Sequence, residues 1–308
     1  MDTITIKLRG ENVPNTDLLS EVPSYLQGLS EHNFGNGTII SGKLGNLNVT
    51  VNERAVKVEN SLCKWYLNNN LQVMARSDIE KAFEKLSDVL HLPIQKADVI
   101  SFHYPKNVML KHDVSLYMPC LGTLSHYNRL EQPHGLNYKG VGRELAFYNK
   151  IREMKYSREP IPALYTGKQI GRFELRYRSG LCKHFNKPAI HASCLYNEAF
   201  YIQVNNDLHK TYLNITKQRK FKTDLDMIQT KEQYKLMGVL SLVKLQGGEM
   251  EALKNINEKL SKGLLTKKQA HDLRELIKKC CQQKLVTVEN ELITEIDSKM
   301  NEAFKFYR

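Results

Sequence analysis

Apolar and polar residues alternate in several short stretches of the first 180 residues, and this alternation is typical of strands with one buried face. Asn and Gly separate the stretches as they would in turns. A Ser-x-x-Glu sequence at 77–80 has the spacing of a helix capping box, and apolar residues at helical spacing follow it up to residue 90. The clearest alternation lies in residues 3–8, 47–51, 97–104, 144–150 and 170–178.

The second part of the chain has a different pattern. From about residue 197 apolar residues recur at helical spacing, and Gly247, Gly248 and Gly263 separate the segments. A second capping box, Thr-Lys-Lys-Gln, stands at 266–269. The pattern predicts an α+β fold with a largely antiparallel sheet in residues 1–215 and a helical region in residues 216–308. The expected C-terminal helices cover residues 230–245, 249–260, 266–281 and 287–306.

Residues 118–142 contain four glycines and two prolines, and this composition predicts a loop between the strand at 97–104 and the strand at 144–150. Another segment, residues 217–222, is a basic run that reads Lys-Gln-Arg-Lys-Phe-Lys. It is either a solvated linker or a segment that contacts phosphates.

The chain has 308 residues and a formal net charge of +12, spread along its length. Such an excess favours polyanionic partners, nucleic acid first and an anionic membrane surface second. No apolar run approaches the roughly 20 residues that span a bilayer, so no membrane protein is expected. The six cysteines form no Cys-x-x-Cys pair and no disulfide-like framework, which indicates reduced thiols in the cytosol.

Candidate chemistry lies on three of the predicted strands. His103 is on the first, Tyr148 and Lys150 share a face of the second, and Glu174 lies between two arginines on the third. His103 and Glu174 could hold a divalent ion, while Tyr148 attacks phosphorus and Lys150 counters the developing charge. Taken singly, these residues could equally be a structural histidine, a surface tyrosine and a solvated charge ladder.

Two motifs carry a resemblance to a known family. Residues 143–153 read Arg-Glu-Leu-Ala-Phe-Tyr-Asn-Lys-Ile-Arg-Glu, and residues 171–176 read Gly-Arg-Phe-Glu-Leu-Arg. In this order they resemble the gene II/X family of rolling-circle replication initiators, found in filamentous phages and related plasmids. The similarity covers roughly residues 40–215.

The resemblance implies an enzyme that nicks and rejoins DNA. Tyr148 matches the nucleophile, which cuts one strand of the origin, stays bound to the 5′ phosphate and leaves a 3′ hydroxyl for a host polymerase. Glu174 matches an acidic residue that holds Mg²⁺ or Mn²⁺. Single-stranded or origin DNA is the expected partner, a host helicase is a further one, and the bacterial cytoplasm is the expected location. The arginines expected to contact DNA are Arg143, Arg172 and Arg176.

The sequence departs from the family at His103, where an aspartate is usual. A neutral imidazole changes the charge and the metal preference of the site. If His103 is not a ligand, Glu144 and Glu153 are the next candidates. Three alternatives stay open: a plasmid mobilisation relaxase with the same chemistry, a DNA-binding regulator without catalysis, and a membrane-surface protein.

Overall fold

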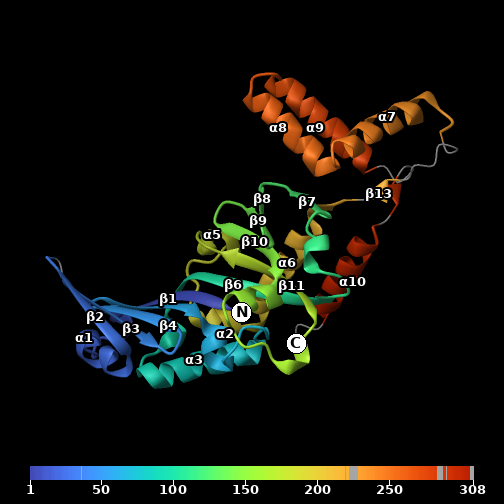
Figure 1. The fold of residues 1–308 in the computed structure, drawn as a ribbon. Coiled ribbons are helices and arrows are strands. Elements are labelled where there is room, and N and C mark those ends of the chain that lie inside the picture. Colours follow the sequence, from blue (N-terminus) through green and yellow to red (C-terminus); the bar gives the residue numbers. More distant parts are fainter. Residues whose placement is uncertain (36, 219, 222–227, 283–286, 289, 306–308) are drawn as a thin grey trace. The chain divides into compact units, whose positions relative to one another are not determined.

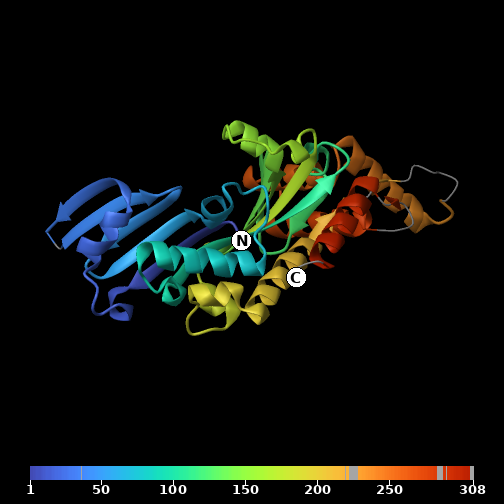
Figure 2. The same ribbon diagram turned by 90° about the horizontal axis from the view of Figure 1, so that it is seen from below.

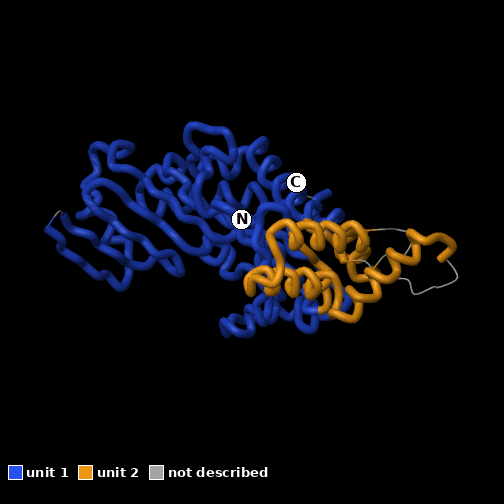
Figure 3. Tube along the Cα trace, turned by 90° about the horizontal axis from the view of Figure 1, so that it is seen from above, with its two compact units in different colours: residues 1–115, 124–214, 299–308 blue, residues 116–123, 215–298 orange. Residues whose placement is uncertain are grey.

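The computed structural model describes residues 1–35, 37–218, 220–221, 228–282, 287–288 and 290–305 (Figure 1). The chain forms two compact units, coloured in Figure 3. The first contains residues 1–115, 124–214 and 299–308, and the second contains residues 116–123 and 215–298. The predicted boundary between a sheet region (residues 1–215) and a helical region (residues 216–308) with separate functions stays a prediction.

A ten-stranded sheet forms the framework of the first unit, with the strand order β2-β3-β4-β5-β1-β6-β11-β10-β9-β8. Each pair of neighbours in it is antiparallel. The predicted α+β class with a largely antiparallel sheet is therefore confirmed. The strands are β1 (Thr3–Arg9), β2 (Gln27–Phe34), β3 (Gly37–Leu44), β4 (Leu47–Asn52), β5 (Ala55–Ser61), β6 (Asp98–Leu110), β8 (Asn128–Gln132), β9 (Gly135–Lys139), β10 (Arg143–Asn149) and β11 (Gln169–Tyr177).

The two faces of the sheet differ in polarity because the side chains of each strand alternate. In β11, Phe173 and Leu175 point to one face, and Arg172, Glu174 and Arg176 point to the other, as the sequence predicts. The apolar face is buried under helices. The opposite face carries the polar residues and leads to the candidate site.

Helix α6 (Glu198–Leu213) covers the apolar face of β6 and β11. Tyr212 packs edge-on against Phe173, and Asn205 accepts a hydrogen bond of 3.0 Å from Tyr104. Figure 2 shows α6 and α3 (Arg76–Leu90) on one side of the sheet, with α4 (Lys150–Tyr156) on the other. The shorter helices of this unit are α1 (Leu18–Glu21), α2 (Leu62–Leu67) and α5 (Leu181–Phe185).

A β-bulge interrupts the alternation of β6. Ile6 of β1 pairs with Val99, whereas Thr5 pairs with Ser101, so Ile100 is the extra residue. Strict alternation of the strand at 97–104 would place Val99 on the same face as Ser101 and His103, but the bulge puts Val99 on the buried apolar face. Beyond the bulge, His103 lies on the polar face, as expected.

Residues 118–142 are not a loop. They contain β7 (Leu121–Leu124), and the β8–β9 hairpin extends the large sheet beyond β10. Turn residues dominate the local composition, but backbone pairing with β10 determines the structure of this segment.

The predicted capping box of α3 is shifted by two residues. Ala75 is the N-cap, and Asp78 accepts the hydrogen bond from its backbone N–H at 2.9 Å. The capping box at Thr266 is confirmed, since Thr266 and Gln269 bond each other's backbone N–H groups.

The second unit is mainly helical, as predicted. Leu240, Ile256 and Ile277 belong to the core shared by its three central helices, which also contains Cys280 and Cys281. β7 pairs with β12 (Ile215–Lys217), and β13 (Lys220–Phe221) pairs with β14 (Thr287–Val288). The helices are α7 (Lys231–Leu245), α8 (Glu249–Ser261), α9 (Lys267–Cys281) and α10 (Glu291–Lys305), whose last residues group with the first unit.

Two residues of the basic run at 217–222, Arg219 and Lys222, lie outside the described residues, so the choice between a linker and a phosphate-contacting segment stays open. Among the helices of the described residues, none has both the length and the apolar character needed to cross a membrane.

Candidate functional site

The three strands that carry the candidate residues are neighbours in the order β6-β11-β10. In the antiparallel register, Arg176 of β11 pairs with His103 of β6, and Tyr148 of β10 pairs with Arg172 of β11. Residues at directly paired positions point to the same face of a sheet. His103, Tyr148 and the polar residues of β11 therefore lie together on the polar face.

The hydroxyl of Tyr148 donates a hydrogen bond of 2.7 Å to Oε2 of Glu174. Glu174 is buried, and Tyr148 is half-buried. Burial raises the pKa of the Tyr148 hydroxyl well above its ordinary value, the charge of Glu174 raises it further, and the charge of Arg172 opposes both effects. In this arrangement Tyr148 is a protonated donor held in one orientation.

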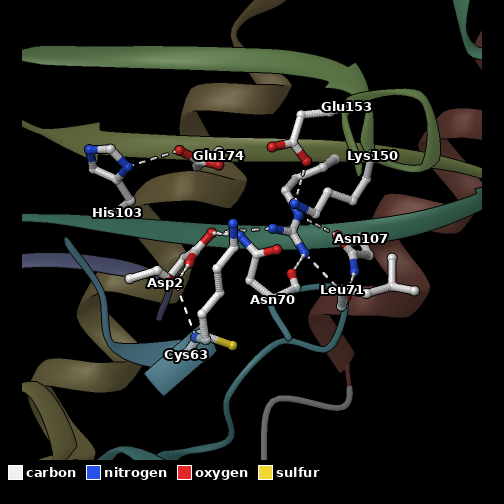
Figure 4. A network of polar contacts seen from close by, with 12 residues as sticks. Asp2, Cys63, Asn70, Leu71, His103, Asn107, Lys150, Glu153 and Glu174 are labelled. Carbon is white, nitrogen blue, oxygen red and sulfur yellow. Dashed lines mark hydrogen bonds and ion pairs between the residues drawn. The ribbon is translucent and has the colours of Figure 1, made fainter. Parts of the chain in front are cut away.

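The other oxygen of Glu174 has two partners. His103 Nδ1 lies 3.0 Å from Oε1 (Figure 4). Arg176 Nε donates to the same atom at 2.7 Å. Burial alone raises the pKa of Glu174, but the contacts with His103, Arg176 and Tyr148 outweigh it and hold the pKa well below its ordinary range. Glu174 is therefore an ionised carboxylate at neutral pH.

Arg176 lies between two acids. Its Nη1 donates to Oε1 of Glu144 at 3.1 Å, while its Nε bonds Glu174. Glu144 also lies 3.6 Å from Nη2 of Arg178. The side chain of Arg176 keeps about a fifth of its surface exposed, so this predicted DNA contact faces the open side of the site.

Arg172 was also expected to contact DNA, but it is fully buried. Its guanidinium donates to Asn107 Oδ1 at 2.8 Å, to Asp2 Oδ2 at 3.3 Å, and to the backbone carbonyls of Asn70 and Leu71 (Figure 4). The predicted direct contact with DNA does not fit this position. The sequence could not show the burial, because most partners of Arg172 come from distant parts of the chain.

Lys150 is not on the strand with Tyr148. Asn149 ends β10 and caps α4 by accepting the backbone N–H of Arg152 at 3.0 Å, so Lys150 is the first residue of the helix. The buried ammonium of Lys150 bonds Glu153, and burial together with the charge of Arg172 lowers its pKa. The positive charge that acts on the Tyr148 hydroxyl comes from Arg172. The position of Lys150 therefore does not fit the predicted role of countering charge at Tyr148.

Arg143 lies on the opposite face of the sheet from Tyr148. It pairs with Tyr177 in the register, and its guanidinium bonds Asp207 of α6 at 3.1 Å. Its role as a DNA contact beside Tyr148 does not fit this position. Side chains alternate between the two faces along a strand, so residues five positions apart, such as Arg143 and Tyr148, point to opposite faces. The sequence alone therefore places Arg143 on the other face from Tyr148.

Nδ1 of His103 faces Glu174, and both oxygens of Glu174 already accept hydrogen bonds, so Nε2 of His103 is the donor left for a metal ion. Within the described part of the chain, no cluster of three His, Cys, Asp or Glu side chains is arranged to hold a metal. Mg²⁺ commonly takes only one or two protein carboxylates and completes its shell with water and phosphate oxygens. An ion at Nε2 of His103 would therefore take most of its ligands from water and the DNA phosphate, with Glu174 holding the imidazole through Nδ1.

A pocket of about 500 Å³ opens beside Tyr148 on the polar face. Sequence analysis missed this pocket, because its walls come from the β8–β9 hairpin and from α4, which were expected to be a loop and part of a strand. Its lining includes Gly135, Asn137, Tyr148, Arg152, Tyr156 and Arg176.

Comparison with known proteins identifies a family for this chain. The family described as the N-terminal region of the replication-associated protein of phage gene II matches residues 23–211, which is more than half of the chain. The chain belongs to this family. A comparison with curated proteins found no match.

Membership confirms the resemblance seen in the sequence, and it supports a role in rolling-circle replication of phage DNA, which implies DNA binding. The match contains Tyr148, Glu174 and His103 and ends before the helices of the second unit.

Proposed function

We propose that this protein is a rolling-circle replication initiator that nicks one DNA strand through Tyr148 and later rejoins it. The observation that carries the proposal is the 2.7 Å hydrogen bond from the Tyr148 hydroxyl to Glu174, on the open polar face of the sheet. A tyrosine needs its hydroxyl held in a defined direction for in-line attack, and this bond provides it.

In the proposed step, Tyr148 Oη forms a bond to phosphorus and the bond from phosphorus to the 3′ oxygen breaks. The products are a 5′-phosphotyrosine and a free 3′ hydroxyl, and the proton lost by Tyr148 is balanced by the one that the 3′ oxygen gains. The reverse reaction rejoins the strand. Host polymerase would extend the 3′ hydroxyl, with a host helicase opening the duplex, in the bacterial cytoplasm.

The neighbouring side chains have separate tasks in this proposal. Glu174 orients the hydroxyl, and its low pKa means that it does not retain the proton. The buried Arg172 places a positive charge next to Tyr148, which favours the developing phenolate. Mg²⁺ or Mn²⁺, bound at Nε2 of His103 while Glu174 holds the imidazole through Nδ1, would polarise the phosphate.

The test is incubation of the purified protein with single-stranded oligonucleotides from the replicon's origin region, with Mg²⁺ or Mn²⁺, followed by mapping of the DNA-linked peptide. The adduct should map to Tyr148. Tyr148→Phe removes only the hydroxyl, so the variant should fold and bind DNA but form no adduct.

Tyr25→Phe is a matched control, since Tyr25 lies in a 3-10 turn (Val22–Tyr25) next to the β2 end of the sheet. An adduct that persists in Tyr148→Phe would identify another nucleophile. DNA binding without any adduct in the natural protein would favour the regulator without catalysis.

A further inference from the structure

The pocket beside Tyr148 has a polar group with no partner. Asn137 of β9 is 8% exposed, yet within the described residues its side-chain amide has no hydrogen bond. The amide is open to water in the pocket, so it is free to bond a ligand there. The Asn137 amide lines the pocket, which makes a ligand there the natural source of the missing bonds.

The position of Asn137 connects it to the reacting groups. Asn137 pairs with Ala146 of β10, and Ala146 pairs with Glu174 of β11, so the three lie in one row across the polar face. Ala146 between them is buried, but Asn137 and Tyr148 line the same pocket. A ligand bonded to Asn137 would therefore lie next to the phosphate that Tyr148 attacks.

The opposite wall of the pocket comes from α4. Tyr156 is 87% exposed and lines the pocket, which offers a flat aromatic surface. Arg152 also lines it, and in the described part of the chain its guanidinium has no hydrogen bond or ion pair. An exposed aromatic ring, a guanidinium without such a bond and an amide are the groups that bind the base and the phosphate of an unstacked nucleotide.

We propose that this pocket binds one unstacked base of the DNA strand, next to the phosphate attacked by Tyr148, and that Asn137 recognises the edge of this base. Tyr156 stacks on the base, and Arg152 binds an adjoining phosphate. This inference rests on the proposed nicking function and adds to it the group that selects the nucleotide. The volume of about 500 Å³ lies within the range of roughly 300–1,000 Å³ typical of small-molecule sites.

The main test selects nicking sites from a randomised single-stranded oligonucleotide library. Both fragments, the one linked to the protein and the one released, are sequenced. The natural protein should prefer one base at a position adjoining the scissile phosphate. Asn137→Leu keeps the branched shape of the side chain but removes the donor and acceptor, so the preference at that position should fall by about tenfold while other positions are unchanged.

Asn206→Leu is the matched control, because Asn206 is exposed on α6, which covers the opposite face of the sheet. Its preferences should equal those of the natural protein. If Asn137→Leu forms adducts with unchanged base preference, the pocket does not read the base, although the nicking function stands. If the natural protein forms no adduct, both proposals fail.

A second measurement covers the case in which Asn137→Leu does not fold. Tyr156 is exposed at the end of α4, so Tyr156→Ala should leave the fold intact. The probe is a selected oligonucleotide with 2-aminopurine at the position adjoining the scissile phosphate, bound to protein that carries Tyr148→Phe. Stacking on Tyr156 should quench the fluorescence.

Tyr156→Ala should abolish the quenching and weaken binding by about tenfold, whereas Tyr156→Phe should retain both. Equal quenching in the alanine and phenylalanine variants would show that the base does not stack on Tyr156, and would overturn the proposal.

Discussion

Tyr148 and Glu174 bond across two strands although they are not paired in the register. Tyr148 lies opposite Arg172, and Glu174 lies opposite Ala146, so the 2.7 Å hydrogen bond runs diagonally. Diagonal neighbours in a sheet are about 7–8 Å apart at the backbone, which a tyrosine can span. The diagonal covers Ala146, which is buried between the two side chains.

We expect Gly135→Ala to reduce nicking with little loss of stability. A Cβ at Gly135 would lie 3.3 Å from Cβ of Tyr148 and 3.3 Å from the backbone oxygen of Phe147, so Tyr148 must move by a few tenths of an ångström. Small displacements of a nucleophile are costly, and we expect the nicking rate to fall about tenfold. The free energy of unfolding should change by less than about 1 kcal/mol, since alanine is favoured over glycine in a strand.

Gly35→Ala is the control for this substitution, because a Cβ at Gly35 has no atom within 4 Å. Single-turnover nicking rates and urea unfolding of both variants provide the comparison. An unchanged rate in Gly135→Ala would show that the position of Tyr148 tolerates this displacement.

Arg172→Lys should strongly destabilise the fold. Lysine keeps the charge but cannot replace the planar fork that bonds Asp2, Asn107 and two backbone carbonyls. Unpaired groups would remain buried, and the loss of unfolding free energy should be about 3 kcal/mol. Urea unfolding measures this loss.

Arg152→Lys is the control, with a change within about 0.5 kcal/mol expected at that exposed position. If both variants unfold at the same urea concentration, the Arg172 network contributes little to stability.

Local sequence patterns correctly predicted the features of the site that depend on the side-chain alternation of one strand. The faces of β11 and the place of Tyr148 on β10 follow from the period of two, and adjacent strands then bring Glu174 to Tyr148. Lys150 was misplaced because the capping bond of Asn149 overrides strand alternation. The burial of Arg172 depends on contacts over about a hundred residues, which no local pattern contains.

Lys106 should make the stability of the protein depend on alkaline pH. Burial lowers the pKa of its ammonium to about 8, from an ordinary value near 10.5. The unfolded state therefore binds more protons between these values, and the free energy of unfolding should rise as the pH increases from about 8 to about 10.5. The difference between the two pKa values corresponds to at most about 3 kcal/mol. The 3.3 Å hydrogen bond to the backbone of Ala303 offsets part of the burial cost at neutral pH.

Lys106→Met should remove this dependence. The variant should be more stable than the natural protein near neutral pH, and the gap should narrow as the pH rises. Urea unfolding at about pH 7 and about pH 10 measures it, with Lys7→Met as control because Lys7 is exposed on β1. A gap that stays constant with pH would contradict the buried charge at Lys106.

His103 should determine the metal preference of nicking. Its Nδ1 faces Glu174 at 3.0 Å, which leaves Nε2 as the nitrogen that can bind an ion. An imidazole suits Mn²⁺ better than Mg²⁺, so the natural protein should nick faster with Mn²⁺. His103→Asp supplies an oxygen donor and should raise the rate with Mg²⁺, whereas His103→Ala should lower the rate with both ions. Titration with Mn²⁺, followed by electron paramagnetic resonance, should show that Mn²⁺ binds more weakly to His103→Ala.

The natural protein, His103→Asp and His103→Ala could instead share one metal preference and similar nicking rates. His103 would then only orient Glu174, and the ion would have to be held by other acids, Glu144 and Glu153 first.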